Sequence, residues 1–143
     1  RTNNMAGFIK PIVHAFLVCD TIIIDSLTGK KSIIGAFTHL WAKTFPCQHP
    51  QVGVYFFFTD AEGRYAFEIQ LVYLDQDKIV GRGSLPPIDI SNRLATQDFG
   101  VNIPYLVFPG PGRYEFRLYA DGHFITQKDF QVIQQESAPS PQS

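Results

Sequence analysis

The stretch PGPGRYEFRLYADGHF, residues 109–124, decides the fold class of this chain. From Tyr114 onward its apolar residues alternate with polar ones, which is the pattern of a strand with one buried face. Asp121 and Gly122 follow, and an Asp-Gly pair is a frequent turn between two antiparallel strands. The stretch therefore predicts a β-hairpin whose second strand begins near Phe124.

The length of the connecting loop decides which residues of this hairpin share a face. A two-residue turn would direct Phe130 and Val132 away from the buried face. A three-residue loop, residues 120–122, with its glycine as a bulge, pairs Leu118 with Phe124 and keeps all the apolar residues together. We therefore predict the bulged hairpin.

A second hairpin is expected between residues 52 and 71, where two runs of alternating apolar residues flank a polar loop, residues 60–63. The loop length places both apolar faces on the same side of a sheet. The expected pairs are Phe58 with Tyr65, Phe56 with Phe67 and Val54 with Ile69.

The rest of the chain also divides into short strands. The further expected strands are 12–19, 21–25, 31–41, 78–85 as a bent edge strand, and 99–103 up to Pro104. Residues 86–97 form the longest irregular stretch. Eight or nine short strands with no convincing helix predict an all-β, antiparallel two-sheet β-sandwich.

Size and composition agree with one folded domain. A chain of 143 residues buries enough surface for a core without disulfides. We expect a flexible segment at 1–10, the domain at 11–134 and a polar, Pro-rich disordered tail at 135–143. The only methionine is Met5, so it is expected to initiate the protein, and residues 1–4 are expected to be a vector remnant or the end of a cleaved segment. Net charge is −1 and the basic residues are scattered, which argues against nucleic-acid binding.

The apolar run from Pro11 to Cys19 is too short for a signal-peptide core, and no run reaches the length of a membrane helix. Cys19 and Cys47 stand apart, with no CxxC spacing, so we expect free thiols. Together these features predict a cytoplasmic protein with no membrane association.

The segment Gly112-x-Tyr114-x-Phe116 resembles the tyrosine corner of immunoglobulin-like domains, in which a tyrosine hydroxyl turns back onto upstream backbone. The resemblance implies an immunoglobulin-like sandwich, although no inter-sheet cysteine pair is present. The motifs FLVCD, TGKKSIIGAF, Phe45-Pro46 and FPGPGRYEFRLYADG are also similar to a family of small uncharacterised bacterial proteins. That second resemblance implies no activity.

Several polar motifs are candidate sites for metals or phosphate. Four loop carboxylates, on Asp60, Glu62, Asp75 and Asp77, are the best calcium candidates, since calcium prefers oxygen ligands. Asp is also an ordinary turn residue, so we expect no metal and no cofactor. A zinc site from Cys47, His49 and His39 lacks paired spacing. Thr28-Gly29-Lys30-Lys31 does not match a phosphate loop, which needs a glycine where Ile24 stands and a Ser or Thr where Lys31 stands.

No nucleophile motif is present, so we expect a protein that is not an enzyme. The clearest functional signal is apolar surface on the second face of the expected 52–71 hairpin. Its interface candidates are Tyr55, Phe57, Val72 and Leu74. The sequence thus predicts an interaction or assembly module with a protein partner or self-association. The alternative is a sandwich that binds calcium or, through Trp41, Phe45 and Tyr55, carbohydrate.

Overall fold

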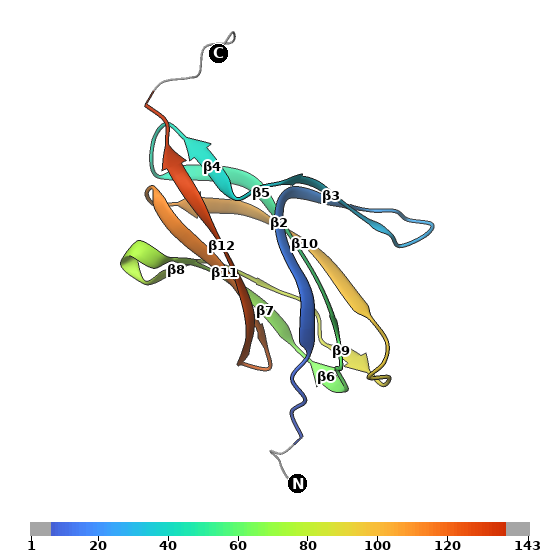
Figure 1. Ribbon diagram of the computed structural model, residues 1–143. Helices are drawn as coiled ribbons and strands as arrows, with labels where there is room; N and C mark the ends of the chain where they lie inside the picture. Colours follow the sequence, from blue (N-terminus) through green and yellow to red (C-terminus); the bar gives the residue numbers. More distant parts are fainter. Residues whose placement is uncertain (1–6, 137–143) are drawn as a thin grey trace.

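The computed structural model describes residues 7–136, and this part of the chain is an all-β fold (Figure 1). It contains eleven strands, more than the eight or nine expected, because the short strands β4, β6 and β9 have too few residues to show a pattern. The strands are β2 (Ile12–Ile24), β3 (Lys31–Ala36), β4 (His39–Ala42), β5 (Cys47–Thr59), β6 (Gly63–Tyr65), β7 (Phe67–Tyr73), β8 (Lys78–Ser84), β9 (Ile88–Ile90), β10 (Gln97–Phe108), β11 (Gly112–Ala120) and β12 (His123–Gln134). One 3-10 turn, η1 (Leu74–Gln76), joins β7 to β8.

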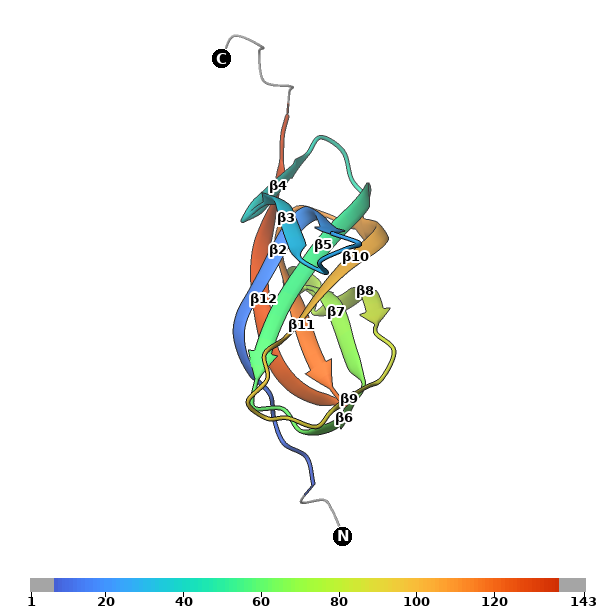
Figure 2. The ribbon, with the colours of Figure 1, turned by 90° about the vertical axis from the view of Figure 1, so that its right-hand side faces the viewer.

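Two larger sheets form the body of the described chain. One has four strands in the order β10-β5-β2-β3, and the other has five in the order β4-β12-β11-β7-β8. Neighbours are antiparallel except β4, which runs parallel to β12. A two-stranded sheet, β6-β9, lies at one end (Figure 1). Figure 2 shows β5 and β10 as one layer in front of β11 and β7 as the other.

Aromatic side chains fill the space between the two layers. Phe56 and Phe58 of β5 are fully buried and meet Phe67 of β7 with ring centroids 5.6 and 5.3 Å apart. On the other side of the core Phe108 packs edge-on against Tyr114 at 5.0 Å. Burying rings of this size supplies the largest apolar contribution to the stability of a small domain.

The expected hairpin between residues 52 and 71 is wrong in its pairing. β5 pairs with β2 and β10, whereas β7 pairs with β11 and β8. Phe56 and Phe67 are therefore neighbours across the core, from opposite sheets, and not across a strand ladder. Alternation shows which face of a strand is buried, but it does not distinguish a ladder partner from a residue of the facing sheet.

The final hairpin forms where expected, with a different turn. Asp121 and Gly122 have φ of 51° and 81° and form a two-residue turn between the paired residues Ala120 and His123. The turn also binds Ala66: the Asp121 carboxylate accepts the Ala66 N–H, and the Asp121 backbone N–H donates to the Ala66 carbonyl. The bulge lies later, at Ile125, where the register shifts. Consequently Ile125 is buried and Phe124 is exposed, contrary to the expectation.

The same bulge restores the expected burial further along. Tyr114 pairs with Phe130 and Gly112 with Val132, and both β12 residues are buried beside β11. The prediction that Phe130 and Val132 lie inside is therefore confirmed, although the residue that shifts the register is not the predicted glycine.

Other boundaries differ in detail. Residues 12–24 form one strand rather than two, and the expected strand 31–41 divides into β3 and β4, which belong to different sheets. The expected edge position of 78–85 is confirmed by β8. β10 continues through Pro104 because it is an edge strand, and Tyr105 takes a φ of 56° there.

Tyr114 binds upstream backbone as a tyrosine corner does. Its hydroxyl donates to Gly110 O at 2.6 Å and accepts from Gly110 N–H at 3.3 Å. Burial raises the pKa of Tyr114 to about 12, so the hydroxyl stays protonated and remains a donor at neutral pH.

The chain ends are partly described. Within the segment expected to be flexible, Phe8 stacks on His123 with ring centroids 3.9 Å apart, and Ile9 O accepts a hydrogen bond from Tyr65. Residues 1–6 and most of the expected tail, 137–143, lie outside the described residues. In the described part, no helix has the length and apolar character that a membrane crossing requires.

Candidate functional site

The outer face of the four-stranded sheet carries apolar side chains. Because Phe16 and Phe56 point into the core, alternation turns their neighbours Leu17 and Tyr55 outward, and these two are paired across β2 and β5. Phe57 also points outward and stacks on His14 with ring centroids 5.6 Å apart. Leu17 is 38% exposed. We call His14, Leu17, Tyr55 and Phe57 the aromatic face.

A polar cluster borders the aromatic face on β10. Asp98 Oδ2 accepts from the Tyr55 hydroxyl at 3.1 Å, and Asp98 Oδ1 lies 2.8 Å from Lys31 Nζ. Burial, together with the neighbouring Asp98 carboxylate, raises the pKa of Tyr55. The phenol is therefore a neutral donor at physiological pH, and its hydrogen bond holds the ring in place.

The second half of β2 and β3 form a hairpin that bends across this face, residues 20–36, which we call the arm. Ile22 of the arm lies over Gly53 of β5 and Gly100 of β10. A Cβ at Gly100 would approach Ile22 Cγ2 to 2.7 Å, and one at Gly53 would approach Ile22 Cγ1 to 3.1 Å. Both glycines therefore provide the space in which the Ile22 side chain packs.

Asn102 fixes the arm from the opposite strand. Its Oδ1 accepts from Ile22 N–H and its Nδ2 donates to Ile22 O, both at 2.9 Å. One β10 side chain thus satisfies both backbone groups of a β2 residue that lies beyond the β2–β5 ladder, which ends at Cys19. This double hydrogen bond determines the direction in which the arm leaves the sheet.

The tip of the arm extends away from the sheets (Figure 1). Asp25 Oδ1 accepts the backbone N–H groups of Leu27 and Thr28 at 2.8 and 3.0 Å, and these bonds lower the pKa of Asp25. Leu27 at the tip is 94% exposed. The exposed apolar residues of the arm are Ile23, Ile24, Leu27 and Ile34.

The outer face of the five-stranded sheet has the opposite character. Arg113 pairs with Asp129, and Arg117 Nε lies 2.6 Å from Glu115 Oε2. Val72 is buried in this sheet, next to Glu115. The Arg113–Asp129 pair faces water, as is typical of a solvated surface, whereas Glu115 is only 7% exposed.

The four interface candidates therefore do not form one patch. Tyr55 and Phe57 face outward on the four-stranded sheet as expected, while Val72 lies in the other sheet and Leu74 in η1. The expectation of a shared face fails because it assumed that β5 and β7 are ladder partners.

The four calcium candidates lie at opposite ends of the molecule. Asp75 contacts Gly112 at the start of β11, while Asp60 and Glu62 lie near the other end of that strand, where Asp121 binds Ala66. A nine-residue strand separates the two ends by about 27 Å. Within residues 7–136, no group of three or more His, Cys, Asp or Glu side chains lies close enough together to hold a metal ion. The same holds for Cys47, His49 and His39, the residues considered for zinc.

The three aromatic residues considered for carbohydrate are also separated. Trp41 is exposed on β4 and packs edge-on against His39 at 5.5 Å. Phe45 packs against the core, and Tyr55 belongs to the aromatic face. No shared stacking surface results from these three.

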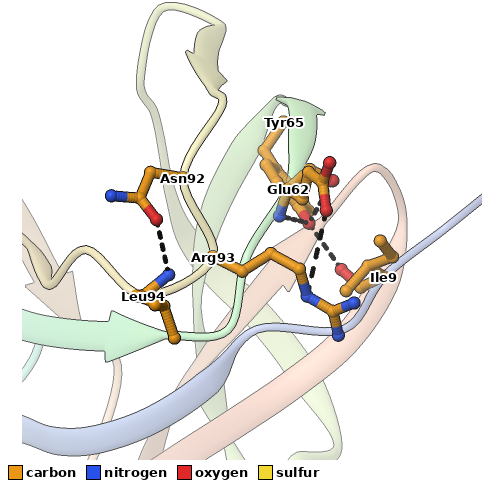
Figure 3. Close-up of polar contacts among 6 residues, drawn as sticks. All are labelled: Ile9, Glu62, Tyr65, Asn92, Arg93 and Leu94. Carbon is orange, nitrogen blue, oxygen red and sulfur yellow. Dashed lines mark hydrogen bonds and ion pairs between the residues drawn. The ribbon is translucent and has the colours of Figure 1, made fainter.

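Sequence reasoning missed a second anchoring tyrosine (Figure 3). The Tyr65 hydroxyl donates to Ile9 O at 2.6 Å and accepts from Glu62 N–H at 2.9 Å, while Glu62 lies 3.9 Å from Arg93. Burial raises the pKa of Tyr65, so it too remains a donor. A hollow of about 360 Å³ opens beside it, lined by residues 7–9 and 62–65 and by Asp121 and His123.

A repeated tripeptide would have identified Tyr65. Gly63-Arg64-Tyr65 begins β6 as Gly112-Arg113-Tyr114 begins β11. Both glycines have positive φ, 120° and 137°, and both tyrosines bind backbone three or four residues upstream. The same local structure therefore closes both ends of the core.

Comparison with known proteins gives a family and a fold. Residues 14–133 match the model of a family of unknown function, DUF6941. No curated protein matches the sequence. Among solved structures, the alkylpurine DNA glycosylase AlkC of Pseudomonas fluorescens, bound to DNA containing an abasic site analog, is similar with a TM-score of 0.55 at 10% identity, over 86% of this chain and 30% of that one.

A β-glucosidase from Listeria innocua is also similar. Its complex with isofagomine gives a TM-score of 0.43 at 9% identity, over 67% of this chain and 15% of that one. Its complex with glucose gives 0.42 at 9% identity, over 66% and 14%. The chain thus spans less than a third of the length of each of these proteins. At such identities the likeness to the glycosylase concerns the fold alone.

Proposed function

We propose, from the premise that this chain belongs to the family of unknown function DUF6941, that it is a non-enzymatic interaction module which binds a protein partner through the aromatic face. The observation that supports this function is the difference between the two outer faces. One carries the Arg113–Asp129 and Arg117–Glu115 pairs, whereas the other presents Leu17, Tyr55 and Phe57 beside an apolar arm. Aromatic residues in a partly exposed patch are typical of interface centres.

The chemistry of the perturbed side chains also supports binding over catalysis. The tyrosines with raised pKa, among them Tyr55, Tyr65 and Tyr114, all donate hydrogen bonds within the protein. A general base would need the opposite shift, towards neutral pH. Their hydroxyls therefore position backbone and side chains.

We assign the finer architecture to the immunoglobulin-like sandwiches. Support comes from two facing sheets and from the Tyr114–Gly110 hydrogen bond at the start of the penultimate strand, β11. A cytoplasmic location is supported by two free cysteines, of which Cys19 is buried.

The test is capture of partners from the native organism with the tagged chain, read by mass spectrometry. Phe57→Glu and Leu17→Glu each place a charge in the aromatic face, and each is expected to weaken partner binding about 30-fold or more, as for an interface anchor. Phe124→Glu is the control, because Phe124 is an exposed apolar residue, at 46%, on the five-stranded sheet.

Circular dichroism and thermal melts of all three variants establish that they fold. A partner lost by the two face variants and kept by Phe124→Glu supports the proposal. Equal recovery by all variants, or no partner with the unmodified chain, would refute it.

A further inference from the structure

The arm and the aromatic face meet along β10. Strand alternation turns Ile22, Ile33 and Lys31 to one side of the arm, because Ile22 and Ile33 are ladder partners and Lys31 lies two residues before Ile33. That side faces the sheet, since Ile22 packs over Gly100 and a Cβ at Gly100 would lie 3.5 Å from Lys31 Cδ. Gly100 is in turn the ladder partner of Tyr55. The stem of Lys31 therefore crosses β10 next to the aromatic face.

Asp98 joins these two parts of the surface. Its Oδ1 lies 2.8 Å from Lys31 Nζ of the arm, and its Oδ2 accepts from the Tyr55 hydroxyl of the aromatic face at 3.1 Å. Asp98 is also the ladder partner of Phe57, so it lies within the same part of the sheet. One carboxylate thus holds a side chain from each part, through a different oxygen for each.

The burial of Lys31 makes this contact necessary for the position of the arm. The Lys31 side chain is only 14% exposed, whereas that of Asp98 is 41% exposed. An ammonium group that has lost most of its water is costly unless a negative charge lies beside it. Among residues 7–136, Asp98 is the one ion-pair partner of Lys31. Without the charge of Asp98, the outer half of the arm has to lift until Lys31 reaches water.

The base of the arm has separate attachments. Asn102 binds both backbone groups of Ile22, and Gln51 Nε2 donates to Thr21 Oγ1 at 2.7 Å. These contacts do not involve Asp98. Loss of the Asp98 contact is therefore expected to release only the outer half of the arm, residues 23–33, and to leave the fold intact.

From this geometry we propose that Asp98 is a positioning residue that couples the arm to the aromatic face, so that the arm regulates partner binding there. The regulation rests on the proposed function of that face, whereas the coupling is a property of the chain alone. Coupling between two sites acts equally in both directions. A change at Tyr55 therefore loosens the arm, and release of the arm frees Tyr55 from its held orientation.

The first experiment is amide hydrogen exchange of the full chain, followed residue by residue by NMR. Asp98→Asn keeps the shape of the side chain and removes its charge, so exchange in residues 23–33 should become about tenfold faster. Adding Lys31→Met should abolish most of this increase, because no buried cation then remains to be paired. This rescue distinguishes the loss of a charge partner from a general loss of packing at Asp98.

A second pair of variants tests whether the coupling reaches the aromatic face. Tyr55→Phe removes the hydroxyl that holds Asp98 and keeps the ring, so exchange in residues 23–33 should become about twofold faster although Tyr55 lies outside the arm. Tyr105→Phe is the control, because Tyr105 is an exposed tyrosine whose hydroxyl forms no hydrogen bond within residues 7–136. If Asp98→Asn unfolds the chain in a thermal melt, the comparison of these two variants decides on the coupling.

The regulation is tested with the captured partner. Asp98→Asn should weaken partner binding about fivefold, and the chain that also carries Lys31→Met should recover most of the affinity. Partner binding that is unchanged while the arm is loosened would refute the regulation.

Three exchange results would overturn the coupling itself. These are unchanged exchange in Asp98→Asn, an increase that Lys31→Met does not relieve, and equal exchange in Tyr55→Phe and Tyr105→Phe. A chain that captures no partner would refute the proposed function and with it the regulation, while the exchange rates still decide on the coupling.

Discussion

Substitution of Tyr114 by phenylalanine removes one hydroxyl from one end of the core and leaves the ring. Tyr114 is fully buried, and its hydroxyl donates to Gly110 O at 2.6 Å while accepting the weaker bond from Gly110 N–H. A buried hydrogen bond contributes about 1 kcal/mol, and a partner left without water costs about 1 kcal/mol more. We therefore expect Tyr114→Phe to lower the free energy of unfolding by about 2 kcal/mol.

For a domain of this size that loss corresponds to a decrease in Tm of about 7 °C. The assay is urea unfolding followed by circular dichroism, with a calorimetric melt. Tyr105→Phe is the control, since Tyr105 is exposed and its hydroxyl forms no hydrogen bond within residues 7–136, so we expect a change below about 0.5 kcal/mol. If both variants change stability equally, the hydroxyl does not hold the Gly110 turn and the reasoning is refuted.

Three further predictions follow from the same structure. The pKa of Tyr114 is raised to about 12 in the folded state, so its contribution to stability is complete below the unfolded pKa of about 10 and is lost as the pH rises through about 12. Thermal melts at alkaline pH should show this loss of stability, and Tyr114→Phe should make the loss smaller. The added side chain in Gly100→Val would overlap Ile22 and displace the arm, which should lower the free energy of unfolding by about 1–3 kcal/mol. Amide hydrogen exchange in residues 21–36 should then be faster, and an exchange rate equal to that of the parent chain would contradict the packing of Ile22 over Gly100. Cys19 is fully buried and burial raises its pKa, whereas Cys47 is partly exposed. A thiol reagent should therefore label Cys47 first and Cys19 only on unfolding. Equal labelling rates in the folded chain would show that Cys19 is accessible.

Burial could be predicted from the sequence more accurately than strand pairing. Alternation placed Phe56, Phe58 and Phe67 inside correctly, because the side-chain period of a strand is independent of its neighbours. The pairing of β5 with β7 was wrong, since two strands that face each other across a core obey the same alternation as two strands in a ladder. The turn at Asp121 depended on Ala66, a contact that the local sequence does not show.

Part of the candidate site could be predicted from the same alternation of side chains along a strand. Tyr55 and Phe57 were correctly placed outward by parity, whereas Val72 was assigned to their face through the incorrect pairing. The hairpin of the arm follows from the expected strands 21–25 and 31–41, but its position over the sheet was not foreseen. That position depends on Gly53 and Gly100, which lie diagonally across the β5–β10 ladder beneath Ile22 and meet it only once three distant strands have assembled.

The hydrogen bond from Tyr65 to Ile9 has a consequence for where the structural unit begins. The family match starts at residue 14, yet Phe8 and Ile9 already contact β6 and β12. A fragment cut at the match boundary would lose the Ile9 carbonyl, the closer of the two acceptors of the Tyr65 hydroxyl, and would uncover one face of His123. The limits of this domain are therefore defined by what Tyr65 binds, several residues before the part of the chain that its relatives share.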